Sequence, residues 1–100
     1  MIRHTLLFEP RKDLSHEQFE ELLAGLRDFP NRYPTMKRFC LGPNISKRDT
    51  TFSYVMTMEF DSVEELEAYL RSEYHQQFVE FMFLPKVERR AIATMDDQAL

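Results

Sequence analysis

The sequence predicts an α+β fold in which helices cover one face of an antiparallel β-sheet. Three observations lead to this prediction. Segments with alternating apolar residues, typical of half-buried strands, lie near both ends and in the middle of the chain. Segments that repeat their apolar residues at helical spacing separate them. The resulting order is β-α-β-β-α-β, and no linker or internal repeat interrupts it.

Four segments have the features of strands. The first covers residues 2–9, and the face that we expect to meet the helices consists of Ile2, His4, Leu6 and Phe8. The strongest strand covers residues 52–60, with one face made of Phe52, Tyr54, Met56, Met58 and Phe60. Residues 35–42 and 87–94 alternate more weakly and complete the sheet.

Capping residues mark where the helices begin. Ser15 begins the first helix, and Gln18 completes a capping box. The buried stripe of that helix is predicted to be Phe19, Leu22, Leu23, Leu26 and Phe29, and Pro30 and Pro34 end the helix. Asp61 or Ser62 caps the next helix, whose inward side chains are Val63, Leu66 and Leu70. Ser72 caps a further helical stretch with one face made of His75, Phe78, Val79 and Met82, and Pro85 ends it.

The order of these elements is that of a ferredoxin-like domain with an antiparallel sheet. We expect residues 1–95 to form one domain and residues 96–100 a C-terminal tail. Helices cover only one face of such a sheet, and apolar side chains such as Leu7 and Val55 occupy the other. We therefore expect a homodimer that buries this face, unless residues such as Thr5, Arg38 and Thr57 keep it solvated.

Composition excludes several classes of function. The net charge is −4 and the isoelectric point is near 5.3, which disfavours nucleic-acid binding and electrostatic membrane binding. The aromatic spacing of Phe52-Ser-Tyr-Val55 is similar to that of an RNA-recognition motif, but Thr50-Thr51 replaces the basic residue and glycine of that motif. With a single cysteine, no signal peptide and no membrane-spanning run, we expect a cytoplasmic protein.

His75, Tyr69 and His4 are the candidate catalytic residues. On an unbroken helix, Tyr69 and His75 would lie about 120° apart, but a helix that restarts at Ser72 lets both side chains face one cavity. A neutral His75 in the first helical turn can act as a general base. Tyr69 would then donate a hydrogen bond to a carbonyl or enolate oxygen, with His4 orienting the same ligand. The alternative is that these side chains are hydrogen-bonded core residues without a catalytic role.

Other chemistry has less support. No histidine or cysteine pair has the spacing of metal ligands, and no serine or cysteine lies in a known nucleophile motif, so we expect neither a metal nor a cofactor. His16 falls at the exposed start of a helix, where a solvated side chain is the simpler interpretation.

Several short motifs resemble the stress-responsive dimeric α/β-barrel (Dabb) family. They are Arg3-His4 followed by Leu7-Phe8, and Glu67-Ala-Tyr-Leu70 followed by His75-Gln-Gln-Phe78. The resemblance covers nearly the whole chain and implies a ferredoxin-like protomer that dimerises through its sheet into a dimeric α/β barrel. It also implies that His4, Tyr69 and His75 match the site residues of plant polyketide cyclases in the family, which catalyse an intramolecular aldol condensation. Ser72-Glu73-Tyr74-His75 departs from the usual pattern because it lacks the proline after the first position.

The resemblance leaves the function open between three alternatives. The first is binding of a small, partly apolar molecule in a helix–sheet cavity, with proton-transfer chemistry of the cyclase or aldol type. The second is a non-catalytic, stress-associated structural or binding dimer. The third is a cofactor-free monooxygenase of the dimeric barrel class. Haem-degrading relatives are disfavoured because the chain has no tryptophan.

Overall fold

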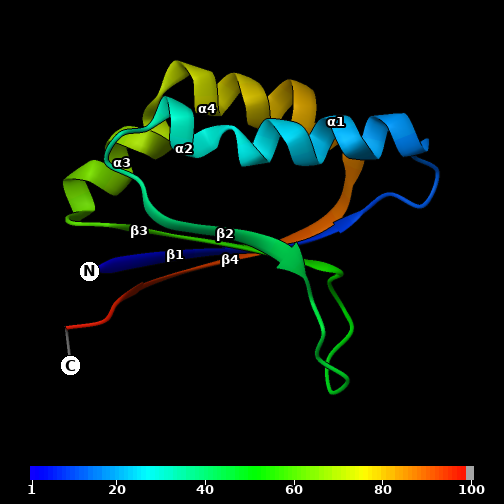
Figure 1. Ribbon diagram of the computed structural model, residues 1–100, viewed down its shortest axis with the longest axis horizontal. Helices are drawn as coiled ribbons and strands as arrows, with labels where there is room; N and C mark the ends of the chain where they lie inside the picture. Colours follow the sequence, from blue (N-terminus) through cyan, green and yellow to red (C-terminus); the bar gives the residue numbers. More distant parts are fainter. Residues whose placement is uncertain (99–100) are drawn as a thin grey trace.

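The computed structural model describes residues 1–98 and has two layers, a four-stranded sheet and a layer of helices on one of its faces (Figure 1). The strands lie in the order β2 (Lys37–Pro43), β3 (Tyr54–Phe60), β1 (Ile2–Pro10) and β4 (Val87–Asp96), and every neighbouring pair is antiparallel. The predicted α+β class and ferredoxin-like element order are confirmed. No helix in the described residues is both long enough and apolar enough to cross a membrane.

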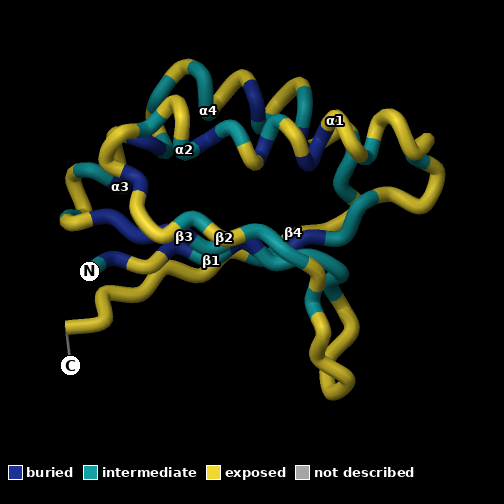
Figure 2. The backbone as a smooth tube through the Cα atoms, viewed as in Figure 1, coloured by how far each residue is buried: buried dark blue, intermediate teal, exposed yellow. Residues whose placement is uncertain are grey.

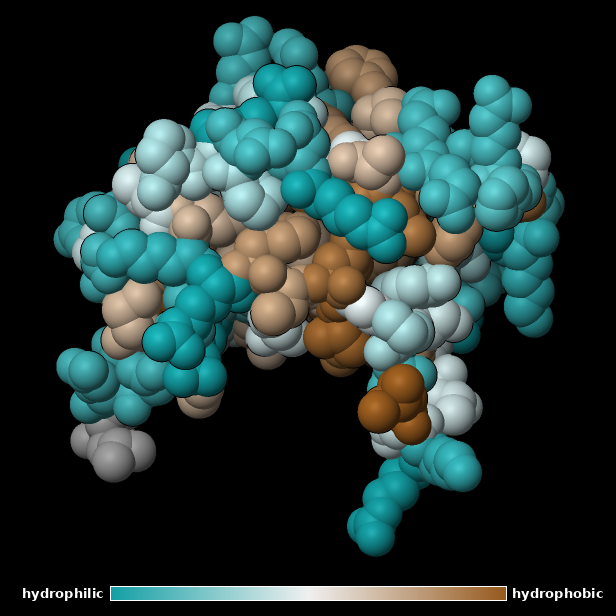
Figure 3. Space-filling view, viewed as in Figure 1, coloured by the Kyte–Doolittle hydropathy of each residue, from teal (hydrophilic) through white to brown (hydrophobic). Residues whose placement is uncertain are grey.

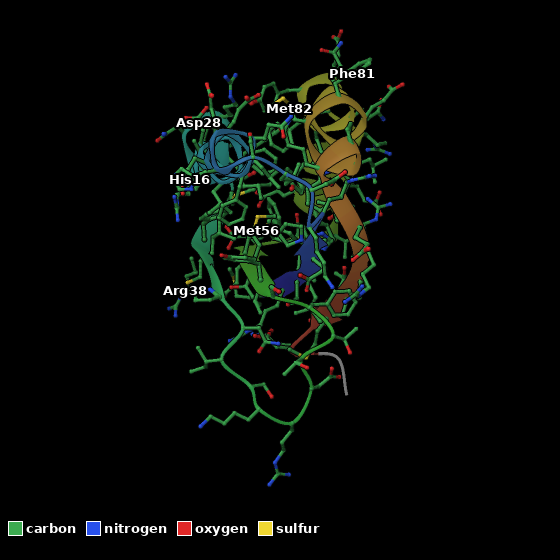
Figure 4. The ribbon with its side chains drawn as sticks, turned by 90° about the vertical axis from the view of Figure 1, so that its right-hand side faces the viewer. His16, Asp28, Arg38, Met56, Phe81 and Met82 are labelled. Carbon is green, nitrogen blue, oxygen red and sulfur yellow. The ribbon has the colours of Figure 1, made fainter. Side chains whose placement is uncertain are left out.

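The two central strands supply the floor of the core. β1 (Ile2–Pro10) pairs with β3 (Tyr54–Phe60), and His4 lies opposite Met58 in the register. Alternate side chains of both strands are buried beneath the helices, as the alternation predicted: Ile2, His4, Leu6, Phe8, Met56, Met58 and Phe60. Met56 points from the sheet toward the helix layer (Figure 4). β3 begins two residues later than predicted, at Tyr54.

The first helical region divides into two helices. α1 (His16–Arg27) has the predicted capping box, in which the Ser15 hydroxyl accepts from the Gln18 backbone and the Gln18 side chain accepts from Ser15. It ends before the predicted stop, and α2 (Phe29–Arg32) follows with Pro30 in its first turn. Proline is tolerated there because the first backbone N–H groups of a helix have no partner within the helix. Pro30 therefore lies within a helix rather than ending one.

The second helical region is interrupted where the sequence predicted. α3 (Val63–Arg71) ends at Ser72, which also caps α4 (Glu73–Phe78). Two short segments follow, the π-helical η1 (Val79–Phe83) and the 3₁₀-helical η2 (Leu84–Lys86). The predicted inward position of Val63 is wrong, since 51% of its surface is exposed at the start of α3.

The π-helical turn also corrects the predicted inward face of the last helical stretch. A π-helical turn is wider than an α-helical turn, because it bonds residue i to residue i+5. Phe83 lies five residues after the buried Phe78 and is buried as well. Met82, which a regular α-helix would place inward, lies instead in the groove facing α1 (Figure 4). Phe81 points away from the sheet and is exposed.

The two edge strands differ from their predicted ranges by a few residues. β2 covers Lys37–Pro43, and Arg38 at its start has a φ of 51° where the register with β3 shifts. β4 covers Val87–Asp96 and continues two residues beyond the predicted strand end. Of the predicted tail 96–100, residues 99 and 100 lie outside the described residues. The exposed loop between β2 and β3 extends away from the sheet (Figure 2).

Phe29 is the centre of an aromatic cluster that joins the helices to one another. Its ring lies 5.0–6.3 Å from five other rings, those of Tyr33, Tyr69, Tyr74, His75 and Phe78. All five pairs are T-shaped, with interplanar angles of 60–79°, and aromatic pairs favour this edge-to-face arrangement. Apolar side chains also reach the surface between the helix layer and the sheet (Figure 3).

Candidate functional site

The Ser72 hydroxyl organises the helix break beside the site. It donates to the Tyr69 carbonyl at 2.9 Å and accepts from the His75 backbone N–H at 3.2 Å. The Tyr33 hydroxyl lies 2.7 Å from the same oxygen. A serine hydroxyl has one hydrogen and two lone pairs, and the carbonyl takes the hydrogen, so Tyr33 must be the donor. The three bonds use all of the hydroxyl's capacity and tie α3, α4 and the end of α2 together.

The break brings Tyr69 and His75 side by side. Tyr69 is the buried last-turn residue of α3, with 3% of its surface exposed, and His75 is the third residue of α4. Their ring centroids lie 4.5 Å apart with an interplanar angle of 59°. The expectation that a helix restarting at Ser72 turns both side chains to one place is confirmed, although this chain lacks the proline of the family pattern.

His4 reaches the same place from the sheet. It is buried on β1, and its ring centroid lies 6.4 Å from that of Tyr69. His4 Nδ1 is 2.8 Å from the Thr94 hydroxyl on the neighbouring strand β4. The three side chains predicted as catalytic therefore line one cavity, while their catalytic roles remain a prediction.

The cavity lies between the helices and the sheet and has a volume of about 320 Å³. This volume is at the lower end of the range for small-molecule sites and is sufficient for a compound of one or two rings. Apart from His4, Tyr69, His75 and Arg90, every side chain that lines it is apolar: Leu6, Leu26, Phe29, Met56, Leu70, Phe78, Val79, Phe83 and Ile92.

Hydrogen bonding determines which nitrogen of His75 carries the proton. Nδ1 lies 3.1 Å from the Leu70 carbonyl oxygen, which can only accept, so Nδ1 is the protonated nitrogen. The neutral ring then has its lone pair on Nε2. Within residues 1–98, neither this Nε2 nor the Tyr69 hydroxyl has a hydrogen-bond partner. In the same residues, every fully buried side-chain nitrogen or oxygen has a hydrogen-bond partner. His75 Nε2 and the Tyr69 hydroxyl have none, so both atoms are accessible from the cavity.

Burial determines the charge state of all three groups. It lowers the pKa of His75 below 6.5, and Arg90 lowers that pKa further, while the bond to Leu70 acts in the opposite direction. Burial also lowers the pKa of His4, with an added effect of His75. The pKa of the Tyr69 phenol is raised by burial and by the nearby Tyr33. The site is thus arranged around neutral imidazoles and a protonated phenol.

The contribution of β4 to the cavity was not predicted from the sequence. Arg90 and Ile92 line the cavity because they pair in register with Phe8 and Leu6, whose side chains face the helices. The signal was the alternation of the last strand, where residues 90, 92 and 94 share a face. Pairing this face with the inner face of β1, which carries His4, would have identified Arg90 as a cavity residue. The last strand is too polar for its inner face to be recognised from its own sequence.

Other candidates lie apart from the cavity. His16 is exposed at the start of α1, and Cys40 is exposed on β2. Among the described residues, no three histidine, cysteine or acidic side chains are close enough together to hold a metal ion.

Comparison with known proteins identifies the family. The model of the stress-responsive A/B barrel domain (Dabb) matches residues 2–96. The chain belongs to the Dabb family. No curated protein matches the sequence.

Solved structures share the Dabb fold at low identity. A protein of Arabidopsis thaliana superposes with a TM-score of 0.86 at 22% identity, covering 100% of this chain and 98% of that one. A Dabb protein with a ferredoxin-like fold from Mesorhizobium loti has a TM-score of 0.85 at 22% identity, with coverage of 98% and 97%. Hydroxynitrile lyase from Passiflora edulis has a TM-score of 0.86 at 20% identity, with coverage of 99% and 95%. These likenesses establish the fold.

Replacing Ser72 by alanine is expected to destabilise the Dabb fold and to disorganise the site. The substitution removes a helix cap and two further hydrogen bonds, so we expect a loss of about 2 kcal/mol in the free energy of unfolding. We also expect the ring signals of His75 to shift in NMR spectra, because the backbone that positions this ring loses its anchor.

Ser62→Ala is the matched control, since Ser62 caps α3 through the same bond to a backbone N–H, at 3.2 Å from Glu65. It should cost about 1 kcal/mol and leave the His75 ring signals in place. Equal effects of the two substitutions on His75 would contradict the role assigned to Ser72.

The Dabb domain is expected to lose stability as the pH falls below neutrality. Because the folded-state pKa values of His4 and His75 are lowered, the unfolded chain binds more protons between those values and 6.5. The free energy of unfolding should therefore decrease from about pH 7 to about pH 5, as urea denaturation can measure. His75→Gln should flatten this dependence, whereas His16→Gln should not, and identical slopes in all three proteins would contradict the burial argument.

Proposed function

We propose that this Dabb protein binds a small, partly apolar molecule in its helix–sheet cavity and catalyses proton transfer of the cyclase or aldol type. The observation that carries the proposal is the pairing of two unbonded polar atoms in an apolar cavity. One is His75 Nε2, with its lone pair free, and the other is the Tyr69 hydroxyl. A base next to a hydrogen-bond donor is the arrangement needed to remove a proton beside a carbonyl group.

The proposed step begins with a bound carbonyl compound. His75 Nε2 takes a proton from the carbon next to the carbonyl, and the electrons of that C–H bond move into the enolate. The Tyr69 hydroxyl donates a hydrogen bond to the enolate oxygen and lowers the energy of that charge. The enolate carbon then attacks a second carbonyl carbon of the same molecule, and the proton on His75 passes to the new alkoxide. No oxidant or reductant is consumed.

The electrostatics of the cavity are consistent with these roles. A histidine whose pKa is lowered is neutral at cellular pH and ready to accept a proton. A phenol whose pKa is raised keeps its hydrogen and acts as a donor. In the proposed step His4, held by Thr94, orients the ligand from the sheet side of the cavity.

One of the fold neighbours is an enzyme by name. Hydroxynitrile lyase from Passiflora edulis shares the fold, so a protein of this architecture is named as a lyase. A protein from Thermobifida fusca, described as a dimeric ferredoxin-like protein of unknown function, has a TM-score of 0.77 at 19% identity, with coverage of 94% and 88%. The chemistry proposed for this chain depends on its own residues.

Proton abstraction can be tested without knowing the natural substrate. The protein is incubated with a panel of aryl methyl ketones in D₂O, and exchange of the methyl protons is followed by NMR. We expect the wild type to accelerate exchange, and His75→Gln to lower that acceleration by about 10²-fold or more. Tyr69→Phe should lower it as well, because the enolate loses its donor.

His16→Gln is the control, because it removes an exposed histidine that lies outside the cavity. It should exchange the ketones at the wild-type rate. If the wild type exchanges none of the ketones faster than buffer, or if His75→Gln exchanges them equally fast, the catalytic part of the proposal is wrong. A non-catalytic binding protein would then be the better description.

We further propose that the protein is a homodimer that pairs the outer faces of two sheets. The register places an apolar row across all four strands on that face: Gly42, Val55, Leu7 and Ala91. The adjacent row is small and uncharged, with Cys40, Thr57, Thr5 and Ala93. Charged residues such as Arg3 and Glu59 follow at one end and Glu9 and Arg89 at the other. An apolar centre with a charged rim is typical of protein interfaces.

Val55→Arg is expected to produce a monomer, because it places a charge in the centre of the apolar row. Sedimentation velocity at micromolar concentration should give a dimer for the wild type and a monomer for this variant. Val63→Arg is the matched control, since Val63 is exposed on α3 and lies outside the sheet. A wild type that sediments as a monomer, or a dimer that survives Val55→Arg, would contradict the sheet-face interface.

A further inference from the structure

Arg90 is the one formally charged side chain that lines the cavity, and no acidic side chain lines it. The chain contains 17 aspartate and glutamate residues and 13 lysine and arginine residues. A cavity lined by a cation and no carboxylate therefore has the opposite charge to the chain as a whole. Within residues 1–98, Arg90 forms no ion pair, whereas the adjacent Arg89 bonds to Glu88 and to the Thr51 carbonyl.

From this geometry we infer that the molecule bound in the cavity carries a carboxylate, and that Arg90 holds this group at the cavity mouth. The inference rests on the proposed function, because it identifies the class of ligand that the same cavity takes. A guanidinium recognises a carboxylate through two parallel N–H···O bonds. Arg90 would thus select acids over neutral compounds of equal size.

The position of Arg90 on β4 fits a mouth rather than the interior. Arg90 is exposed, and Ile92, two residues along the same face, also lines the cavity with 54% of its surface exposed. The helices therefore leave this part of the inner face of β4 uncovered. Thr94, which bonds to His4, follows on the same face.

Spacing along β4 indicates the size of the ligand. His4, which pairs in register with Thr94, lines the cavity at the level of the sheet farthest from Arg90. A strand rises about 3.3 Å per residue, so the four residues from Arg90 to Thr94 place Arg90 about 13 Å from this level. A two-ring aromatic acid spans most of this length when its carboxylate lies at Arg90. Its rings would then lie among the apolar side chains near Tyr69 and His75.

The test compares acids with their neutral amides in binding titrations of the full chain. The probes are 2-naphthoate with 2-naphthamide and 4-phenylbenzoate with its amide, followed by ¹H–¹⁵N NMR spectra up to millimolar concentration. We expect the wild type to bind each acid about tenfold more tightly than its amide, a preference that declines with added salt because Arg90 is exposed. In Arg90→Gln the acid should lose this advantage while the amide binds unchanged.

Arg89→Gln is the matched control, because it removes the same charge from the opposite face of the same strand. It should retain the preference for acids. Equal binding of acid and amide by the wild type, or an acid preference that survives Arg90→Gln, would overturn the role of Arg90 and leave the cavity as a binding site. If no compound perturbs the cavity residues at all, the proposed binding function fails, and the inference fails with it.

Discussion

The site depends on three hydrogen bonds made by one hydroxyl, that of Ser72. This hydroxyl caps α4 at its start, bonds to the last turn of α3, and accepts from Tyr33 beyond α2. The hydroxyl uses all of its donor and acceptor capacity in these three bonds, and together they fix its position. The break between the helices is thus maintained by a capped and fully satisfied serine rather than by the steric restriction of a proline.

The chemistry of the cavity follows from this break. On a continuous helix Tyr69 and His75 would face directions about 120° apart, and one of the two rings would leave the core. With the break, the rings lie 4.5 Å apart, and the freed Leu70 carbonyl accepts from His75 Nδ1. The same local event therefore places the His75 ring beside the Tyr69 ring and determines the tautomer of His75. Burial under the aromatic cluster of Phe29 then keeps the imidazole neutral.

Local signals in the sequence were sufficient for the order of the four strands and the main helices, and for three of the four polar cavity residues. Alternation placed His4 on the inner face of β1, and the serine cap placed His75 after a break. Two features depend on long-range structure and were not predictable in this way. The first is the π-helical turn, which buries Phe83 where a regular α-helix would bury Met82. It was not predictable because the register shift of a π-helical turn has no strong local signal in the sequence. Arg90 was missed because the inner face of a polar edge strand is defined only by its register with β1.

That edge strand links the two faces of the sheet. β4 is bonded to β1 along one side and ends the described sheet on the other. Arg90 and Ile92 project toward the cavity, whereas Ala91 and Ala93 belong to the two central rows of the outer face. The helices leave Ile92 exposed, so few contacts on the inner face of the sheet stabilise β4 at this part of the cavity wall. In the proposed dimer a partner sheet packs on the two alanines and holds β4 from behind. Assembly and ligand binding would then stabilise the same strand, and each would strengthen the other by the same free energy.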